Sequence, residues 1–200
     1  MATRNRSSEV RQQQIIDAVR KLIIKYGSEH LTVRKIATEV GFSEAAIYRH
    51  FKSKKEILFF LTEHISQSLI DDIDKAKTLS NGTSLDTIDR ILKSHLSAIK
   101  QKKGVSFQII AEIISLGDKK LNKKVSDTID NYIDRLHRIL SDGVVSGMVR
   151  EDIDLKASAT LLFGMIQGLV NMWALSNYNF NIQQKYESLW SVFREAVIKR

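Results

Sequence analysis

Hydrophobic residues recur every three or four positions along most of the chain, which is the spacing of one face of an α-helix. No stretch alternates convincingly between apolar and polar residues in the manner of a half-buried strand. The pattern therefore predicts an all-α protein of about nine helices. Two of them begin near residues 44 and 54, and the others are expected over residues 9–26, 33–40, 84–101, 105–116, 118–146, 154–177 and 183–198.

A tight glycine turn is predicted between the second and third helices. Thr32 is placed to cap the start of the second helix, Gly41 to end it, and Ser43 to cap the third. Ile47 and Phe51 lie one turn apart and share the inward face of the third helix. The polar residues between them must therefore point away from the core.

The next predicted helix leads away from this small module. Its apolar residues repeat every four positions from Ile57 to Ile73, and the polar segment 78–84 then makes the clearest break in the chain. We therefore expect two domains. Residues 1–53 would form an N-terminal arm and a three-helix module, and residues 54–200 a larger helical domain joined to it by the fourth helix.

Positive charge is concentrated in the first third of the chain. The whole protein carries a net charge of +8, and residues 1–60 contain 12 Lys+Arg against 6 Asp+Glu, whereas residues 61–200 contain 19 against 17. An anionic partner is therefore expected for the first third. Nucleic acid and an acidic membrane surface both meet this condition, and charge does not choose between them.

The composition argues against several kinds of chemistry. The sequence has no cysteine, and its five histidines lack the spacing of a metal site. Ser97 and Lys100 have the spacing of a serine–lysine nucleophile but lack the companion motifs of that enzyme class. No apolar core of a signal peptide follows the basic N-terminus. We therefore expect a cytoplasmic protein that is not an enzyme, with neither metal nor cofactor.

The segment LTVRKIATEVGFSEAAIYRHFKSKKEIL, residues 31–58, carries the most specific motif. Two short helices around a glycine turn, the second flanked by bases, are typical of a DNA-binding helix-turn-helix. The order of Thr, Ile-Ala, Gly-Phe-Ser, Ile-Tyr-x-x-Phe and Lys resembles the N-terminal signature of the TetR/AcrR family of bacterial transcriptional repressors. The resemblance covers residues 9–60 and implies a dimer that binds a double-stranded DNA operator.

The resemblance also assigns candidate DNA contacts. Small Ala45 and Ala46 would allow close approach to thymine methyl groups, and Arg49 would reach guanine or a phosphate. Arg4 and Arg6 would either reach the DNA as an arm or form a solubilising tail. The complete set of predicted DNA-binding residues is Thr32, Arg34, Lys35, Ser43, Glu44, Ala45, Ala46, Tyr48, Arg49, His50 and Lys54.

The predicted helix over residues 154–177 is apolar on nearly every side, and residues 157–184 contain no charge. A membrane span is one reading, but Gln167 and Asn171 interrupt the apolar stretch, so burial inside a protein is favoured and no membrane partner is expected. Packing the last two helices against a second copy would bury them in a four-helix bundle. The predicted interface of this homodimer is Leu161, Met165, Leu169, Trp173, Leu189, Trp190 and Phe193.

The middle helices are a candidate site for a small hydrophobic effector. Their side chains are apolar with few polar groups, which is typical of a small-molecule site and equally of an ordinary filled core. The segment 140–175 is similar to the same region in family members that respond to fatty acyl-CoA. The predicted ligand-binding residues are His95, Phe107, Ile110, Ile114, Leu136, His137, Leu140 and Met165.

The resemblance leaves a second function open. Nucleoid-occlusion relatives in the same family carry a comparable SEAA-YRHF helix and act as DNA-bound adaptors that contact a cell-division protein. A ligand-responsive repressor is the favoured interpretation, and an adaptor of this kind is the alternative.

Overall fold

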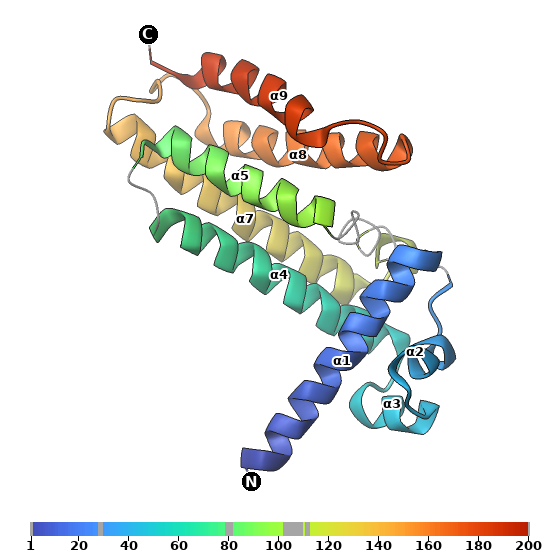
Figure 1. Cartoon of the computed structure of the whole chain (residues 1–200). Coiled ribbons are helices and arrows are strands. Elements are labelled where there is room, and N and C mark those ends of the chain that lie inside the picture. Colours follow the sequence, from blue (N-terminus) through green and yellow to red (C-terminus); the bar gives the residue numbers. More distant parts are fainter. Residues whose placement is uncertain (1, 28–29, 79–81, 102–109, 111–112, 200) are drawn as a thin grey trace. The chain divides into compact units, whose positions relative to one another are not determined.

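A computed structural model describes residues 2–27, 30–78, 82–101, 110 and 113–199 of the chain, and its architecture is all-α (Figure 1). The described ranges contain no β-strand, only an isolated bridge between Val149 and Ile198. Residues 113–116 form a short helical segment. The long helices are α1 (Ala2–Tyr26), α2 (Val33–Val40), α3 (Glu44–His50), α4 (Lys54–Thr78), α5 (Ser84–Gln101), α7 (Lys119–Val145), α8 (Leu155–Leu175) and α9 (Ile182–Val197).

The hydrophobic spacing predicted these helices well, with one clear difference at the N-terminus. The first helix begins at Ala2, whereas the pattern placed its start near residue 9. Residues 2–8 contain no glycine or proline that would stop a helix, although they lack the apolar stripe that the prediction relied on. The segment expected to be an N-terminal arm is therefore part of α1.

The chain divides into two compact units. Unit 1 contains residues 1–65 and 105–125, and unit 2 contains residues 66–104 and 126–200. Contacts within a unit thus join segments that are far apart in the sequence. The start of α7 belongs to the same unit as the first three helices.

Unit 1 is built on a core shared by α1, α2, α3 and the start of α4. Ile47 of α3 has no exposed surface, and the ring of Phe51, just after α3, is 2% exposed. Phe42 is only partly buried, and the guanidinium of Arg11 lies 5.0 Å from its ring centroid. Fully buried residues of this core include Ile15, Ile16, Val19, Ile36, Leu58, Leu61, Ile113 and Leu121.

In unit 2, α9 packs against both α8 and α5. Both C-terminal helices start at a capped residue: the Asp154 carboxylate accepts from the Ala157 amide at 2.9 Å, and Asn181 accepts from the Gln184 amide at 3.2 Å. Each helix buries one stripe at helical spacing. The buried residues of this pair are Ala159, Leu162, Ile166, Leu169, Val170 and Trp173 in α8, and Ile182, Tyr186, Trp190, Phe193 and Val197 in α9.

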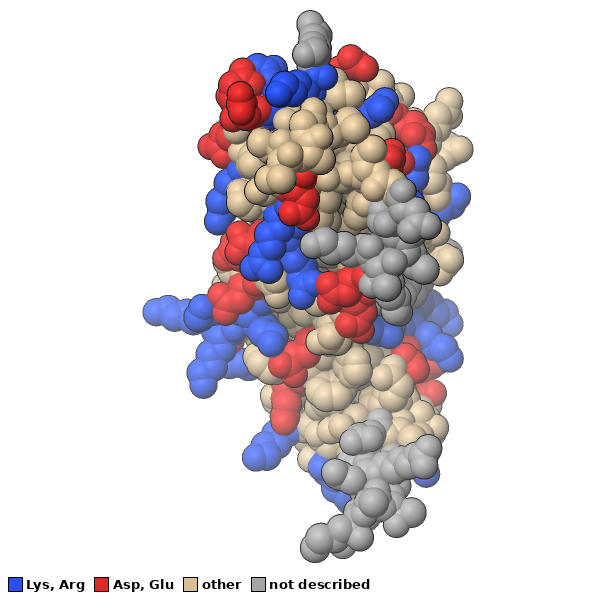
Figure 2. All heavy atoms as spheres, turned by 90° about the vertical axis from the view of Figure 1, so that its left-hand side faces the viewer, with Lys and Arg blue, Asp and Glu red and all other residues tan. Residues whose placement is uncertain are grey.

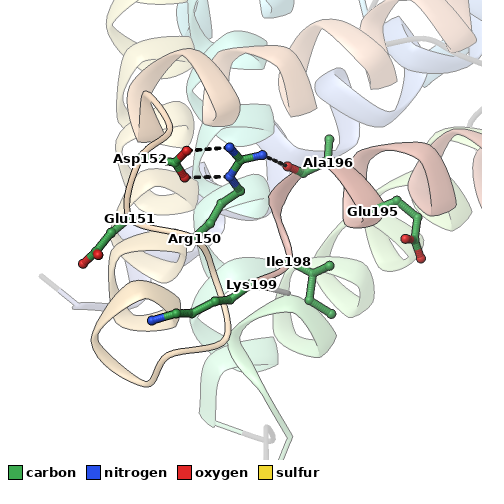
Figure 3. A pocket seen from close by; sticks show the side chains of 7 residues that line it. All are labelled: Arg150, Glu151, Asp152, Glu195, Ala196, Ile198 and Lys199. Carbon is green, nitrogen blue, oxygen red and sulfur yellow. Dashed lines mark hydrogen bonds and ion pairs between the residues drawn. The ribbon is translucent and has the colours of Figure 1, made fainter.

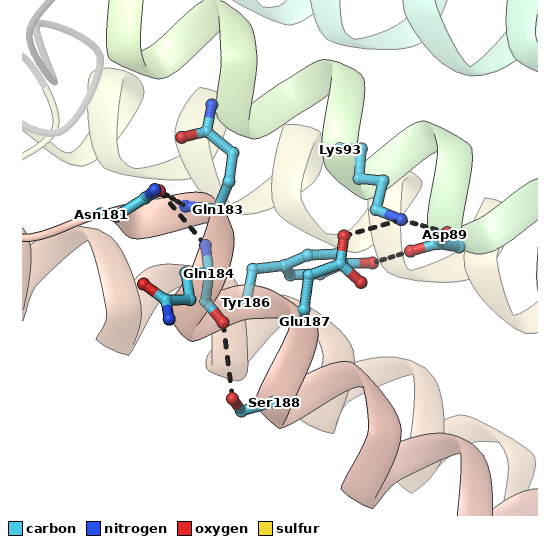
Figure 4. Close-up of polar contacts among 8 residues, drawn as sticks. All are labelled: Asp89, Lys93, Asn181, Gln183, Gln184, Tyr186, Glu187 and Ser188. Atoms are coloured by element: carbon cyan, nitrogen blue, oxygen red, sulfur yellow. Dashed lines mark hydrogen bonds and ion pairs between the residues drawn. The ribbon is translucent and has the colours of Figure 1, made fainter.

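A polar cluster joins α5 to α9 beside this apolar stripe (Figure 4). The hydroxyl of fully buried Tyr186 donates to Asp89 at 2.8 Å, and the Lys93 ammonium pairs with both Asp89 at 2.8 Å and Glu187 at 2.9 Å. Burial, and then the hydrogen bond to Asp89, raises the pKa of Tyr186 far above its usual value. The phenol therefore stays neutral and serves as a hydrogen-bond donor.

We predict that Tyr186→Phe lowers the free energy of unfolding by about 1.5–3 kcal/mol, because it removes a buried hydrogen bond to a charged group. Urea denaturation followed by circular dichroism measures this change. Tyr48→Phe is the matched control, since Tyr48 is 50% exposed and should leave the urea midpoint unchanged. Equal stability of the two variants would show that the hydroxyl of Tyr186 contributes nothing.

Candidate DNA-binding surface

Short-range hydrogen bonds set the ends of α2 and α3. The hydroxyl of Thr32 accepts from the Lys35 amide at 3.2 Å, and that of Ser43 accepts from the Ala46 amide at 3.1 Å. Gly41 ends α2 with φ of 76°, a left-handed conformation that favours glycine. Both predicted N-caps and the predicted glycine end of α2 are confirmed.

The burial of Ile47 decides which side of α3 faces outward. With that side chain in the core, Glu44, Ala45, Tyr48 and Arg49 are all exposed. Ala46 and His50 lie at the edges of this outer face and are half-buried. The outer face of α3 therefore presents an acidic side chain (Glu44), a methyl group (Ala45), a phenol (Tyr48) and a guanidinium (Arg49).

The start of α4 is fixed by a capping box that follows α3 directly. The Glu56 amide donates to the Ser53 hydroxyl at 3.2 Å, and the Lys52 amide donates to the Glu56 carboxylate at 2.5 Å. Lys54 is half-buried in the first turn. These hydrogen bonds fix the backbone of Lys54, the first residue of α4, and so the position from which its side chain extends.

Arg34 and Lys35 lie exposed in the first turn of α2, next to exposed Thr32. The ammonium of Lys35 is 5.4 Å from the centroid of the Tyr26 ring, which also lies 5.0 Å from the ammonium of Lys25. All eleven predicted DNA-binding residues thus lie in unit 1, on α2, on α3 and at their caps, or in the first turn of α4.

Charged side chains of both signs are interspersed over the face drawn in Figure 2. On this face charge of one sign does not dominate, so net charge alone does not mark a candidate site. The arrangement of α2, α3 and the start of α4 makes this surface the candidate, because it groups exposed basic side chains around one outward-facing helix.

The predicted effector-binding residues are only partly brought together. In unit 2, the side chains of Leu136 and Leu140 are fully buried, and those of His95 and His137 are half-buried. Ile110 and Ile114 belong to unit 1, and Phe107 lies outside the described residues. Ile114 is 65% exposed, which corrects its placement in a cavity: its neighbour Ile113 takes the core position of that helical turn.

Sequence reasoning missed Tyr132, which is buried beside His95. The Tyr132 hydroxyl lies 3.3 Å from Nδ1 of His95, and its ring packs edge-on to Phe163 with centroids 6.1 Å apart. The helical spacing of Tyr132 relative to Leu136 is the signal that would have placed it on the same face. The contact between His95 and Tyr132 is therefore a polar one among apolar side chains such as Leu136.

Four predicted interface residues lie in the interior of a single subunit. Leu169, Trp173, Trp190 and Phe193 are at most 7% exposed without any second copy. The indole of Trp173 also donates to the Phe180 carbonyl at 3.1 Å. They belong to the buried stripes through which α8 and α9 pack against each other within one subunit.

The outward side of the same two helices is nevertheless apolar. Leu161 is 61% exposed, Met172 53%, Leu175 86% and Val192 71%. Leu161, half-buried Met165 and half-buried Leu189 also line a groove of about 320 Å³ between α8 and α9. Three of the seven predicted interface residues therefore lie on a surface that a second copy could cover.

By length and composition α8 is able to cross a membrane, and it is the one described helix that passes this test. In the structure it packs against α9 through a continuous buried stripe. Such packing is the behaviour of a core helix in a globular protein.

A second surface cleft, of about 590 Å³, lies between the residues before α8 and the end of α9 (Figure 3). Within it the Arg150 guanidinium donates to Asp152 at 2.6 and 2.5 Å and to the Ala196 carbonyl at 3.5 Å. The hydrogen bond from Arg150 lowers the pKa of Asp152. Arg150 therefore joins the segment before α8 to the end of α9, and no predicted site residue lies here. Among the described residues no cluster could hold a metal ion.

A helix-turn-helix whose second helix presents Tyr48 and Arg49 outward is typical of a DNA-binding protein. The chain matches the family model of bacterial regulatory proteins of the tetR family over residues 15–59, and the model of the C-terminal region of YsiA-like protein over residues 61–196. The protein belongs to the TetR family of transcription regulators.

Named relatives fall into two groups. The chain is 24% identical over 169 residues to the fatty acid metabolism regulator protein of Bacillus subtilis, covering 84% of this chain and 86% of the relative. It is 27% identical over 191 residues to the nucleoid occlusion factor SlmA of Actinobacillus pleuropneumoniae, covering 94% and 93%. The names of both groups describe regulators or DNA-associated factors.

A solved relative has the same fold. The transcriptional regulator FadR from Bacillus subtilis, crystallised in complex with stearoyl-CoA, superposes with a TM-score of 0.78 at 23% identity, covering 90% of this chain and 96% of FadR. The helical fold of this chain is therefore also that of a solved transcriptional regulator.

Proposed function

We propose that the protein is a dimeric transcriptional repressor that leaves its palindromic operator when it binds a small hydrophobic ligand, a fatty acyl-CoA. The observation that carries this proposal is the match of residues 61–196 to a YsiA-like C-terminal region, together with the likeness to a regulator crystallised with stearoyl-CoA. In this proposal residues 1–53 read DNA in the cytoplasm, and residues 54–200 bind the effector and the second subunit.

The roles on DNA follow from the faces of the helices. Glu44, Ala45 and Arg49 are exposed on the outer face of α3 and would meet base edges, with Ala46 at its margin. The exposed phenol of Tyr48 and the Lys54 ammonium would donate to backbone phosphates. The basic side chains of Arg34 and Lys35 in α2 would add affinity for any DNA sequence.

Unit 2 supplies support for an apolar ligand. The layer formed by α5 and α7 buries Ile91, Leu92, Leu136 and Leu140 around the contact between His95 and Tyr132. A largely apolar lining with a few polar groups is the usual character of a small-molecule site. His95 and Tyr132 are therefore the polar residues that we assign to ligand orientation.

A duplex recovered by selection from a random-sequence library tests the main proposal. We expect stearoyl-CoA to raise the apparent Kd for that duplex at least tenfold, because a ligand that prefers the DNA-free state shifts the population toward it. Fluorescence anisotropy measures the Kd, and free coenzyme A is the control. Unchanged DNA binding with stearoyl-CoA and with shorter acyl-CoAs would contradict the effector assignment.

The alternative function is that of a DNA-bound adaptor contacting a cell-division protein, supported by the 27% identity to a nucleoid occlusion factor over 94% of this chain. A genome-wide binding map separates the two proposals. One or a few promoter sites support a repressor, and many dispersed chromosomal sites support an adaptor.

Arg49 and Lys54 should affect DNA binding in different ways. Arg49→Ala should change the preferred sequence and cost about 1–3 kcal/mol at the affected base pair, because it removes a contact to a base edge. Lys54→Ala should weaken binding to all sequences and, because both subunits of the dimer lose the lysine, flatten the salt dependence by about two units of slope. Salt titrations on the selected and a random duplex measure both effects; equal losses for Arg49→Ala on the two duplexes would make Arg49 a phosphate contact.

The exposed apolar side of α8 should hold the second subunit. Leu161→Glu places a charge on that surface, so we expect a monomer near the chain mass of 22.8 kDa. Val145→Glu is the matched control, since Val145 is 88% exposed at the end of α7 and its change should leave the dimer intact. Light scattering after size-exclusion chromatography reads the mass, and a dimeric Leu161→Glu protein would move the interface elsewhere.

A further inference from the structure

Folding concentrates positive charge further than the sequence does. Unit 1 contains 16 Lys+Arg against 9 Asp+Glu, a net charge of +7, whereas unit 2 contains 15 against 14, a net charge of +1. Part of this difference comes from residues 118–124, DKKLNKK, which have four lysines and one aspartate. They lie far from the helix-turn-helix in sequence but belong to its unit.

The start of α7 is held firmly in unit 1. Leu121 is fully buried in the same core cluster as Ile47, and Val125 packs against that cluster. The Asp118 carboxylate caps α7 by accepting from the amides of Lys120 and Leu121, both at 3.0 Å. The first turn of α7 therefore has a defined place beside the helix-turn-helix core.

Asp118 also links this turn to the first turn of α4. Its carboxylate pairs with the ammonium of Lys55, the residue after the proposed phosphate contact Lys54, and this bond lowers the pKa of Asp118. About two turns further on, Lys124 pairs with Glu63 at 3.0 Å and lies 5.8 Å from the Phe59 ring centroid. The two helices run side by side here (Figure 1).

Three of the four lysines of this segment are exposed, Lys119, Lys120 and Lys123, and the first two lie in the first turn of α7. Asp118 is engaged by Lys55 and by the helix cap, and Lys124 is engaged by Glu63. Lys119 and Lys120 are both exposed, next to the basic edge formed by Lys54 and Lys55. The basic edge of the DNA-binding unit thus continues from α4 onto α7.

We propose that Lys119 and Lys120 form a second phosphate-binding surface, which contacts the DNA backbone outside the groove that α3 enters. The inference rests on the proposed docking of α3 on duplex DNA. Lysine ammonium groups match phosphate oxygens without reading sequence, so this surface adds affinity for any duplex and leaves the choice of operator to α3.

The variant Lys119→Gln/Lys120→Gln tests this proposal on a random-sequence duplex of about 40 base pairs, which is long enough to extend past the contacts of one dimer. We expect the slope of log K against log salt to become less steep by about 2–4 units, since each phosphate contact contributes about 0.9 and a bound dimer loses up to four of them. Both side chains are exposed, so the unfolding midpoint should not change.

The matched control is Lys156→Gln/Lys185→Gln, which removes the same charge from exposed positions in unit 2. The control should keep the wild-type slope. An unchanged slope for the α7 variant, or an equal loss in the control, would overturn the proposal. A wild-type protein that binds neither this duplex nor a selected one would instead reject the DNA-binding role of α3 itself.

Discussion

The complete burial of Ile47 under α3 is the constraint on which the DNA-binding surface depends. A seven-residue helix has too few hydrogen bonds to hold its orientation alone, so its inward side chain must fix its rotation. Because Ile47 lies in the core, Tyr48 and Arg49 must face solvent. A change that loosened this contact would therefore disturb every outward residue together.

The caps at Thr32 and Ser43 cooperate with this burial. They define where α2 and α3 begin, and the left-handed Gly41 sets the angle between the helices. The capping box at Ser53 and Glu56 then starts α4 at a fixed distance from α3. The basic edge is thus positioned by backbone hydrogen bonds and one buried core.

Unit 2 shows how one apolar helix can serve two surfaces. The buried stripe of α8, which includes Trp173, packs against α9, and Leu161 and Met172 on the other side of the helix remain exposed. The cluster of Tyr186, Asp89 and Lys93 ties α9 to α5. The helices that present the proposed dimer surface are therefore attached to the layer that contains His95 and Tyr132.

Local sequence determined the helices, their caps and the outward face of α3, because spacing and capping depend on residues within a few positions of one another. The same reasoning placed Trp173 and Trp190 at a subunit interface, since periodicity shows that a face is buried but not what buries it. Only the tertiary structure decided that these residues pack within one subunit. It also decided that Lys119 and Lys120 belong to the DNA-binding unit, because a contact between residues 55 and 118 depends on how distant segments fold together.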